Sequence, residues 1–222
     1  MNALEQTLFE NGSLEEVTNY YNTNNECLTK TNDNDDTPFY IACSKGNFLV
    51  AQFILEKDNA MLTTKNNNKC TPFYAACSNG HINIAVWLYE KDNAMLTAKN
   101  DTLCTPFYAA CFNGHLNIGK WIYEKDNSQL AIPNRTKCTP FYVACLNGHI
   151  EFAKWIYEID NTQLTIKNEN ECTPFYASCF RGHLNISQWI YELNQIQLTV
   201  TNKSLCTPFY ACLLYTSPSP RD

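Results

Sequence analysis

The sequence predicts an all-α solenoid in which two-helix units stack along one direction. Three observations support this prediction. The string Thr-Pro-Phe-Tyr begins at Thr37 and recurs every 34 residues up to Thr207. Each period contains two short apolar segments with helical spacing, and a glycine separates them. A fixed period of this length is typical of supersecondary units that cannot bury their apolar faces alone and therefore stack on one another.

The first helix of a unit is expected to begin at the Thr-Pro pair, as at Thr71-Pro72. A threonine oxygen can cap free amide groups, and a proline in the first helical position lacks the N–H that would otherwise have no acceptor. The residues from Phe73 to Ser78 then form a short helix. It should end at Asn79-Gly80, because glycine accepts the left-handed conformation that terminates helices.

The second helix is expected from about Ile82 to Lys91, where apolar residues recur with helical spacing. Asp92-Asn93 should close it, with asparagine in a left-handed turn. Met95 to Thr97 is predicted to be an extended apolar anchor, and Lys99 to Leu103 a polar loop. One unit therefore consists of two antiparallel helices and a projecting loop.

The repeated strings carry a family resemblance. The most regular ones are TPFYAACSNGHINIAVWLYE and TPFYVACLNGHIEFAKWIYE. They resemble the ankyrin repeat, whose pattern has Thr-Pro, an apolar residue, a pair of small residues, Gly-His and an aliphatic second helix. The resemblance implies an ankyrin-type helix-turn-helix solenoid with projecting extended loops. It divides the chain into an N-terminal capping repeat (1–36), five repeats (37–206) and the start of a truncated sixth repeat (207–211).

Three features depart from the family pattern. A tyrosine, such as Tyr74, stands where the ankyrin pattern usually has histidine. The unit has 34 residues instead of the commoner 33, so the curvature of the stack could differ. Tryptophans replace common leucines in the second helix, as at Trp87, and should bury large aromatic areas between neighbouring repeats.

The last residues break the pattern. Residues 212–222 read CLLYTSPSPRD, whereas the repeat predicts an Asn-Gly turn after Ala211. This string resembles a translated sequencing adapter, so we interpret it as a non-native tail and expect the natural protein to continue past Ala211. A genuine Ser/Pro tail is the alternative.

Composition excludes several functional classes. The net charge of −6 is mild, and no basic stripe is present for neutralising phosphates. The chain has neither an export signal nor a run of roughly 20 apolar residues. We therefore expect a cytoplasmic or nuclear protein that is not secreted, that binds neither nucleic acid nor membranes, and that is monomeric when complete.

The cysteines occupy two repeat positions, and one of these positions lies four residues before a recurrent histidine, as in Cys77/His81. A zinc site needs four convergent ligands, but a glycine turn separates each pair and the segment has no carboxylates. A catalytic Cys-His pair is equally weak, because a nucleophile is not copied in every repeat. We expect buried reduced thiols, loop-bonding histidines, no metal and no cofactor.

Positions that vary among the repeats indicate the partner-binding site. Three apolar residues follow the recurrent cysteine, and polar residues border them: Phe112, Leu146 and Phe180, followed by Asn113, Asn147 and Arg181. The loop tips vary as well, at Leu103, Arg135, Lys137 and Glu169. The ankyrin resemblance implies that both sets line the concave face and its fingers. An apolar stripe with a polar rim is typical of a protein interface, although the same residues could instead pack under the neighbouring loop.

The resemblance favours a non-catalytic scaffold or adaptor that binds a protein partner, whose identity a shared fold does not reveal. Two alternatives stay open. The repeats could be the targeting module of a larger enzyme or receptor that is truncated at the C-terminus. The chain could also be a thiol-rich metal or redox protein, which would show bound zinc or fast thiol modification without denaturant.

Overall fold

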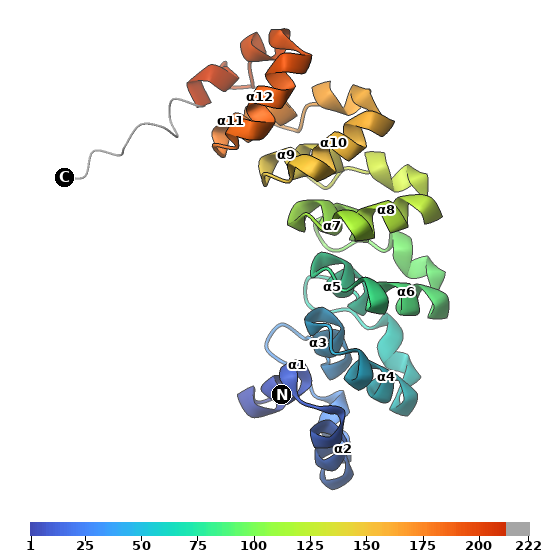
Figure 1. Cartoon of the computed structure of the whole chain (residues 1–222). Coiled ribbons are helices and arrows are strands. Elements are labelled where there is room, and N and C mark those ends of the chain that lie inside the picture. Colours follow the sequence, from blue (N-terminus) through green and yellow to red (C-terminus); the bar gives the residue numbers. More distant parts are fainter. Residues whose placement is uncertain (212–222) are drawn as a thin grey trace, which may run out of the picture. The chain divides into compact units, whose positions relative to one another are not determined.

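The computed structural model describes residues 1–211, in which all regular secondary structure is helical (Figure 1). The tail at residues 212–222 lies outside the described residues. Two compact units are present, Met1–Ala110 and the part of the chain from Cys111 onward. The boundary between them runs through one helix, so it does not coincide with a repeat boundary. The division by repeats into 1–36, 37–206 and 207–211 stays a prediction.

Each unit is a succession of helix pairs, and each pair is followed by a short 3-10 helix (η) and a loop. The first unit contains α1 (Ala3–Asn11), α2 (Leu14–Thr23), η1 (Asn25–Thr29), α3 (Pro38–Lys45), α4 (Phe48–Lys57), η2 (Asn59–Thr63), α5 (Pro72–Ser78), α6 (Ile82–Lys91) and η3 (Asn93–Thr97). Helix α7 (Pro106–Asn113) spans the boundary.

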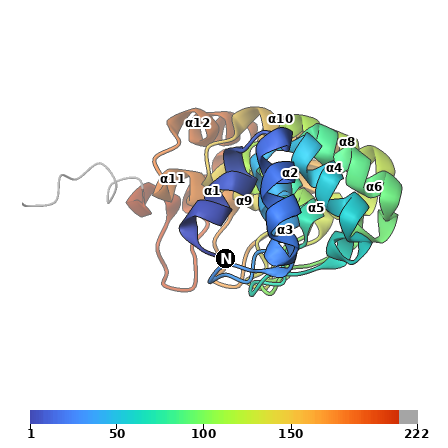
Figure 2. The same ribbon diagram turned by 90° about the horizontal axis from the view of Figure 1, so that it is seen from below.

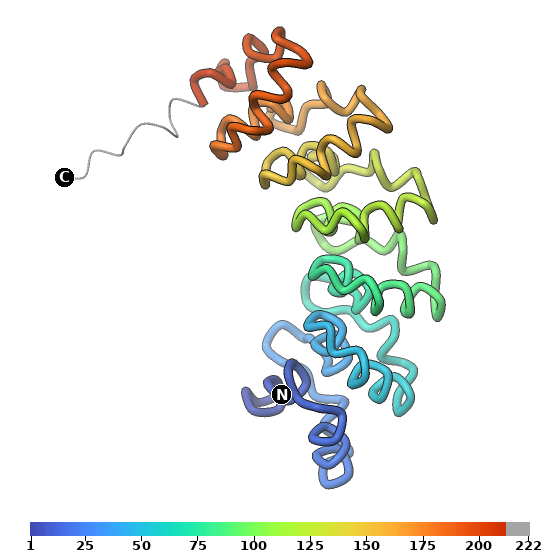
Figure 3. Tube along the Cα trace, in the orientation of Figure 1, coloured from blue at the N-terminus to red at the C-terminus, as the bar shows by residue number. Residues whose placement is uncertain are grey.

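The second unit repeats the same order of elements (Figure 3). It contains α8 (Leu116–Lys125), η4 (Asn127–Ala131), α9 (Pro140–Leu146), α10 (Ile150–Ile159), η5 (Asn161–Thr165), α11 (Pro174–Phe180), α12 (Leu184–Leu193) and η6 (Gln195–Thr199).

The predicted start and end signals of the first helix are confirmed. The Thr71 hydroxyl accepts a hydrogen bond from the Tyr74 amide at 3.1 Å, and proline occupies the first turn of α5. Thr139 caps α9 in the same way, through the Tyr142 amide at 3.2 Å. After α5, Gly80 adopts the left-handed conformation with φ +84°.

The expected end of the second helix at Asp92 is confirmed, since Asp92 is the C-terminal cap of α6. Two other expectations were wrong, because Asn93 begins a 3-10 helix instead of a left-handed turn and Met95 is not extended. Asp92 is extended, with φ −151°, and its carboxylate accepts a hydrogen bond from the Ala94 amide at 3.0 Å. It therefore caps a 3-10 helix that contains Met95, where an extended anchor was predicted. The aspartate side chain competes for the local amides and thereby starts a new turn. The left-handed residues outside glycine lie in the loops instead, for example Lys69 with φ +59°.

The core is built from the repeated positions. The phenylalanine of each Thr-Pro-Phe-Tyr string, such as Phe73, is fully buried in the first helix, and Ile84 and Leu88 of the second helix pack in the same core. The predicted tryptophan packing is confirmed, since the Trp87 ring lies edge-on to Phe39 at 6.3 Å and to Phe48 at 5.4 Å in the preceding repeat. First helices pack on first helices, α1 and α5 on α3 and, in the second unit, α9 on α11.

Within each unit, the loops that connect the helix pairs project from the same side of the helical layers (Figure 2). Neighbouring tips are joined by backbone hydrogen bonds, from Asp101 N–H to the Asn68 carbonyl at 2.9 Å and from Glu169 N–H to the Thr136 carbonyl at 2.9 Å. The tyrosine that replaces the family histidine accepts a hydrogen bond from a loop asparagine, as between Tyr142 and the Asn168 amide at 3.1 Å. The phenol thus contacts a side chain where the family histidine contacts backbone.

Candidate functional site

The predicted apolar stripe lies at the ends of three first helices. Phe112 is in the last turn of α7, Leu146 ends α9 and Phe180 ends α11. Phe112 is 47% exposed and Phe180 is 49% exposed, whereas Leu146 is half-buried. About half of each phenylalanine side chain is therefore open to solvent, so neither is fully covered by a neighbouring loop, which was the alternative to a binding role.

Phe180 does not stand alone on its helix. Its ring stacks on Tyr176, one turn earlier in α11, with a centroid distance of 6.3 Å and an interplanar angle of 12°. Residues four apart on a helix lie on the same face, so the pair forms a continuous aromatic surface. Stacking restricts the conformations of both side chains.

The recurrent histidines position the stripe by its backbone. The Nε2 atom of His149 lies 2.9 Å from the Phe112 carbonyl oxygen, and that of His183 lies 3.0 Å from the Leu146 carbonyl oxygen. A carbonyl oxygen only accepts, so Nε2 carries the hydrogen in both rings. His81 makes the same contact with Ser44 at 2.9 Å in the first unit. The expectation that these histidines bond a loop was wrong, because each acceptor carbonyl lies in the last turn of a first helix in the preceding repeat.

A glycine in the preceding repeat makes room for each histidine ring. Gly114 and Gly148 have φ +76° and +84°, and a Cβ atom on either would lie within 3 Å of the ring of His149 or His183. Glycine is required here both for the left-handed backbone and for the close approach. The glycine of one Gly-His motif thus contacts the histidine of the motif in the next repeat. We call this inter-repeat contact the glycine–histidine clasp.

The polar residues beside the stripe differ in orientation. Asn113 and Arg181 are exposed, and Arg181 is the C-terminal cap of α11. Asn147 is half-buried, and its side-chain amide donates to the Val143 carbonyl of its own helix at 3.2 Å. Asn147 is therefore less exposed to solvent than Asn113 and Arg181.

The predicted loop residues lie in different units. Arg135, Lys137 and Glu169 are exposed in the second unit, and Lys137 has a left-handed backbone with φ +60°. Leu103 is 44% exposed with φ +63°, and it belongs to the first unit. The structure therefore does not place Leu103 relative to the stripe.

The cysteines are in environments that suppress thiolate chemistry. Cys43, Cys77, Cys111 and Cys145 are fully buried and form no disulfides. Burial raises the pKa of each of these thiols, and it raises the pKa of Cys70 to about 11. Since the thiolate is the reactive form, these residues behave as small apolar core residues. Within residues 1–211, no three histidine, cysteine or acidic side chains gather in a way that could hold a metal ion.

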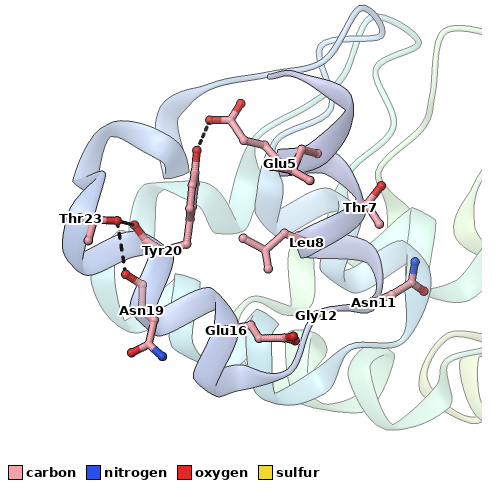
Figure 4. A pocket seen from close by; sticks show the side chains of 10 residues that line it. Glu5, Thr7, Leu8, Asn11, Gly12, Glu16, Asn19, Tyr20 and Thr23 are labelled. Atoms are coloured by element: carbon pink, nitrogen blue, oxygen red, sulfur yellow. Dashed lines mark hydrogen bonds between the residues drawn. The ribbon is translucent and has the colours of Figure 1, made fainter.

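The sequence-based reasoning missed one concave feature. A groove of about 700 Å³ lies between α1 and α2, lined in part by Leu8, Gly12 and Tyr20 (Figure 4). The available signal was the leucines at positions 4 and 8 of a segment predicted to be a polar capping repeat, because such a surface has no structural need for them.

Comparison with known proteins identifies the family. A family model described as ankyrin repeats (three copies) matches residues 7–100, 91–168 and 107–202. The search of curated proteins gave no match. Within the described residues, no helix is long and apolar enough to cross a membrane. The family matches cover most of the chain, and helix pairs, Thr-Pro caps and glycine–histidine clasps recur within the matched residues. The chain therefore belongs to the ankyrin repeat family.

Proposed function

We propose that this chain is a non-catalytic scaffold or adaptor that binds a protein partner on the concave face of the stack, through the first helices of its second unit. Ankyrin repeats are protein–protein interaction modules, typically without enzymatic activity, which supports the general class. The observation that supports this surface is the exposure of Phe112 and Phe180, at 47% and 49%, at one repeat position.

Large apolar side chains at equivalent positions favour a docking surface. Aromatic residues dominate the energetic centres of interfaces, and arginine is enriched beside them. In this surface, Phe180 is stacked on Tyr176 and adjoins Arg181. The loop residues Arg135, Lys137 and Glu169 would supply a charged rim in the same unit.

The clasp contributes preorganisation. His149 and His183 hold the backbone at Phe112 and Leu146, so partner binding orders little additional chain. Affinity would then depend on the side chains presented, and partner choice on how these vary between repeats.

Binding can be tested with ligands selected from a random peptide display library against the immobilised full chain. Replacing Phe112 and Phe180 together by alanine should reduce the binding free energy of the selected peptides by about 2 kcal/mol or more, a typical cost for two interface anchors. Leu184→Ala is the matched control, because Leu184 is 71% exposed but lies on the second helix α12. Unchanged helical circular dichroism with unchanged peptide affinity in the double variant would refute the proposed surface.

Of the two alternatives, the thiol-rich redox or metal protein has less support, because burial raises the pKa values of the core thiols. Zinc analysis of the purified chain and thiol modification without denaturant test it directly. The role as the targeting module of a larger enzyme or receptor uses the same binding surface. Sequencing the natural transcript past the codon for Ala211 tests it.

A further inference from the structure

The groove between α1 and α2 is the feature that the repeat pattern leaves unexplained. It has a volume of about 700 Å³ and is lined by Leu4, Leu8, Gly12, Glu16, Tyr20 and Thr23, among others. Figure 4 shows Leu8 pointing from α1 toward α2, with the hydrogen bond between Tyr20 and Glu5 at one end. A volume in this range suits the side chains of a bound ligand or peptide.

Hydrogen bonds fix the end of the groove at Tyr20. The Tyr20 hydroxyl donates to Glu5 at 2.8 Å and accepts from the Asn24 amide at 3.2 Å. Glu5, which is 2% exposed, also accepts from Lys30 at 2.8 Å. The aromatic ring is therefore held in place, and the groove is formed before anything enters it.

Leu4 and Leu8 occupy positions that are buried in the following repeat. In the 34-residue register, Leu4 stands at the position of the buried Pro38 and Leu8 at the position of the fully buried Ala42. Leu4 is 78% exposed and Leu8 is half-buried. A terminal repeat with a polar outer face stays in solution without such residues. Two leucines beside a preformed groove instead resemble the apolar part of a docking site.

The segment that forms the groove is strongly acidic, and two of its acidic residues, Glu5 and Glu16, line the groove. Residues 1–36 contain eight acidic side chains and one lysine, whereas the whole chain has a net charge of only −6. The single lysine, Lys30, is engaged with the buried Glu5. Glu16 is exposed on the rim, and hydrogen bonds from the Ser13 amide and hydroxyl lower the pKa of its carboxyl group. An occupant therefore meets an apolar groove in a negative field.

We propose that the α1/α2 groove binds a basic amphipathic helix of a partner protein. Its leucine-sized side chains enter the groove against Leu4, Leu8 and Tyr20, and its lysines or arginines face Glu16 on the rim. This is the helix-in-groove mode of recognition, with charge complementarity choosing the partner. The site lies in the first unit and is separate from the surface of Phe112 and Phe180.

The test uses the full chain and two fluorescent helical peptides of the same length. One combines leucine on one face with lysine on the other, and its control carries glutamate in place of lysine. The lysine peptide should bind, with an affinity that falls as salt rises, and should shift the amide resonances of residues in α1 and α2. The glutamate peptide should not bind.

Variants locate the binding. Leu4→Gln should lower the affinity for the lysine peptide by about tenfold, as expected for an interface anchor. Glu16→Gln should lower this affinity as well, and the glutamine side chain preserves the capping box with Ser13. Leu184→Gln changes an exposed leucine outside the groove and should leave affinity unchanged.

Three results would overturn the proposal. The lysine peptide could fail to bind, it could bind equally to wild type and Leu4→Gln, or its resonance shifts could lie outside α1 and α2. Self-association of the full chain that Leu4→Gln abolishes would also overturn it, because the occupant would then be a second copy.

Discussion

The glycine–histidine clasp makes a prediction that separates two physical effects at one residue. Gly148 has φ +84°, and a Cβ atom there would lie 2.7 Å from Cε1 and 2.8 Å from Nδ1 of His183. The same ring is held by its 3.0 Å contact with the Leu146 carbonyl. Gly148→Ala therefore introduces backbone strain and also a steric clash with a ring that is not free to move.

The free-energy costs of the backbone strain and of the lost histidine contact are approximately additive. A left-handed conformation costs a non-glycine residue about 1–2 kcal/mol. Displacing the His183 ring loses a hydrogen bond that contributes about 1 kcal/mol net. Gly148→Ala should therefore lower the free energy of unfolding by about 2–3 kcal/mol. In a His183→Ala background the clash is absent, and the same change should cost only about 1–2 kcal/mol.

Urea denaturation followed by helical circular dichroism measures this double-mutant cycle. Gly148→Asn is a further control, because asparagine tolerates the left-handed conformation but still carries the Cβ that meets the ring. The asparagine variant should keep the part of the cost that depends on His183. If Gly148→Ala costs the same with and without His183, the close approach has no energetic role and the argument for the clasp is wrong.

Three other predictions concern single sites. Gln163 is buried with its Oε1 atom unpaired, while its Nε2 atom donates to the Asp160 carboxylate at 2.8 Å. The equivalent residue in an earlier repeat is the buried Met95. Gln163→Met removes the unsatisfied oxygen and the hydrogen bond together, so the two effects should offset each other and the free energy of unfolding in urea titrations should change by less than about 1 kcal/mol. Lys69 has φ +59°, and Lys69→Gly should stabilise by up to about 1 kcal/mol in the same assay, because only glycine adopts this conformation without strain; a loss of stability would contradict that reasoning. The Lys30 hydrogen bond, with those of the Asn2 amide and Tyr20, lowers the pKa of Glu5 to about 2, so its contribution to stability is complete above its ordinary pKa near 4.5 and is lost as the pH falls toward 2. Thermal unfolding between these pH values should therefore show an acid-induced loss that Glu5→Gln reduces, and an identical pH profile in that variant would count against the network.

Several elements of the fold could be predicted because their signals are local. Thr71 and Pro72 lie next to the amides they affect, and the left-handed Gly80 ends its helix regardless of what packs nearby. The 3-10 helix at Met95 was missed because the Asp92 side chain bonds an amide two residues away, which the apolar pattern does not reveal.

The candidate surface was only partly predictable. Variation among the repeats pointed to Phe112, Leu146 and Phe180, yet their exposures differ because Leu146 is half-buried while both phenylalanines are open. Nothing in the spacing indicated that Tyr176 stacks on Phe180 or that the Asn147 amide turns back to its own helix. These features depend on rotamers, which packing selects.

The sequence by itself determined the repeat unit, the helix starts and the buried positions of the recurrent cysteines, because each depends on neighbours within a few residues or on simple periodicity. Only the tertiary structure decided that His149 and His183 bond carbonyls 37 residues away, and that the N-terminal leucines border a groove. Those contacts join residues that are distant in the chain or lie on different helices. They exist only after the helices have packed, since packing alone sets the distances and the exposure on which they depend.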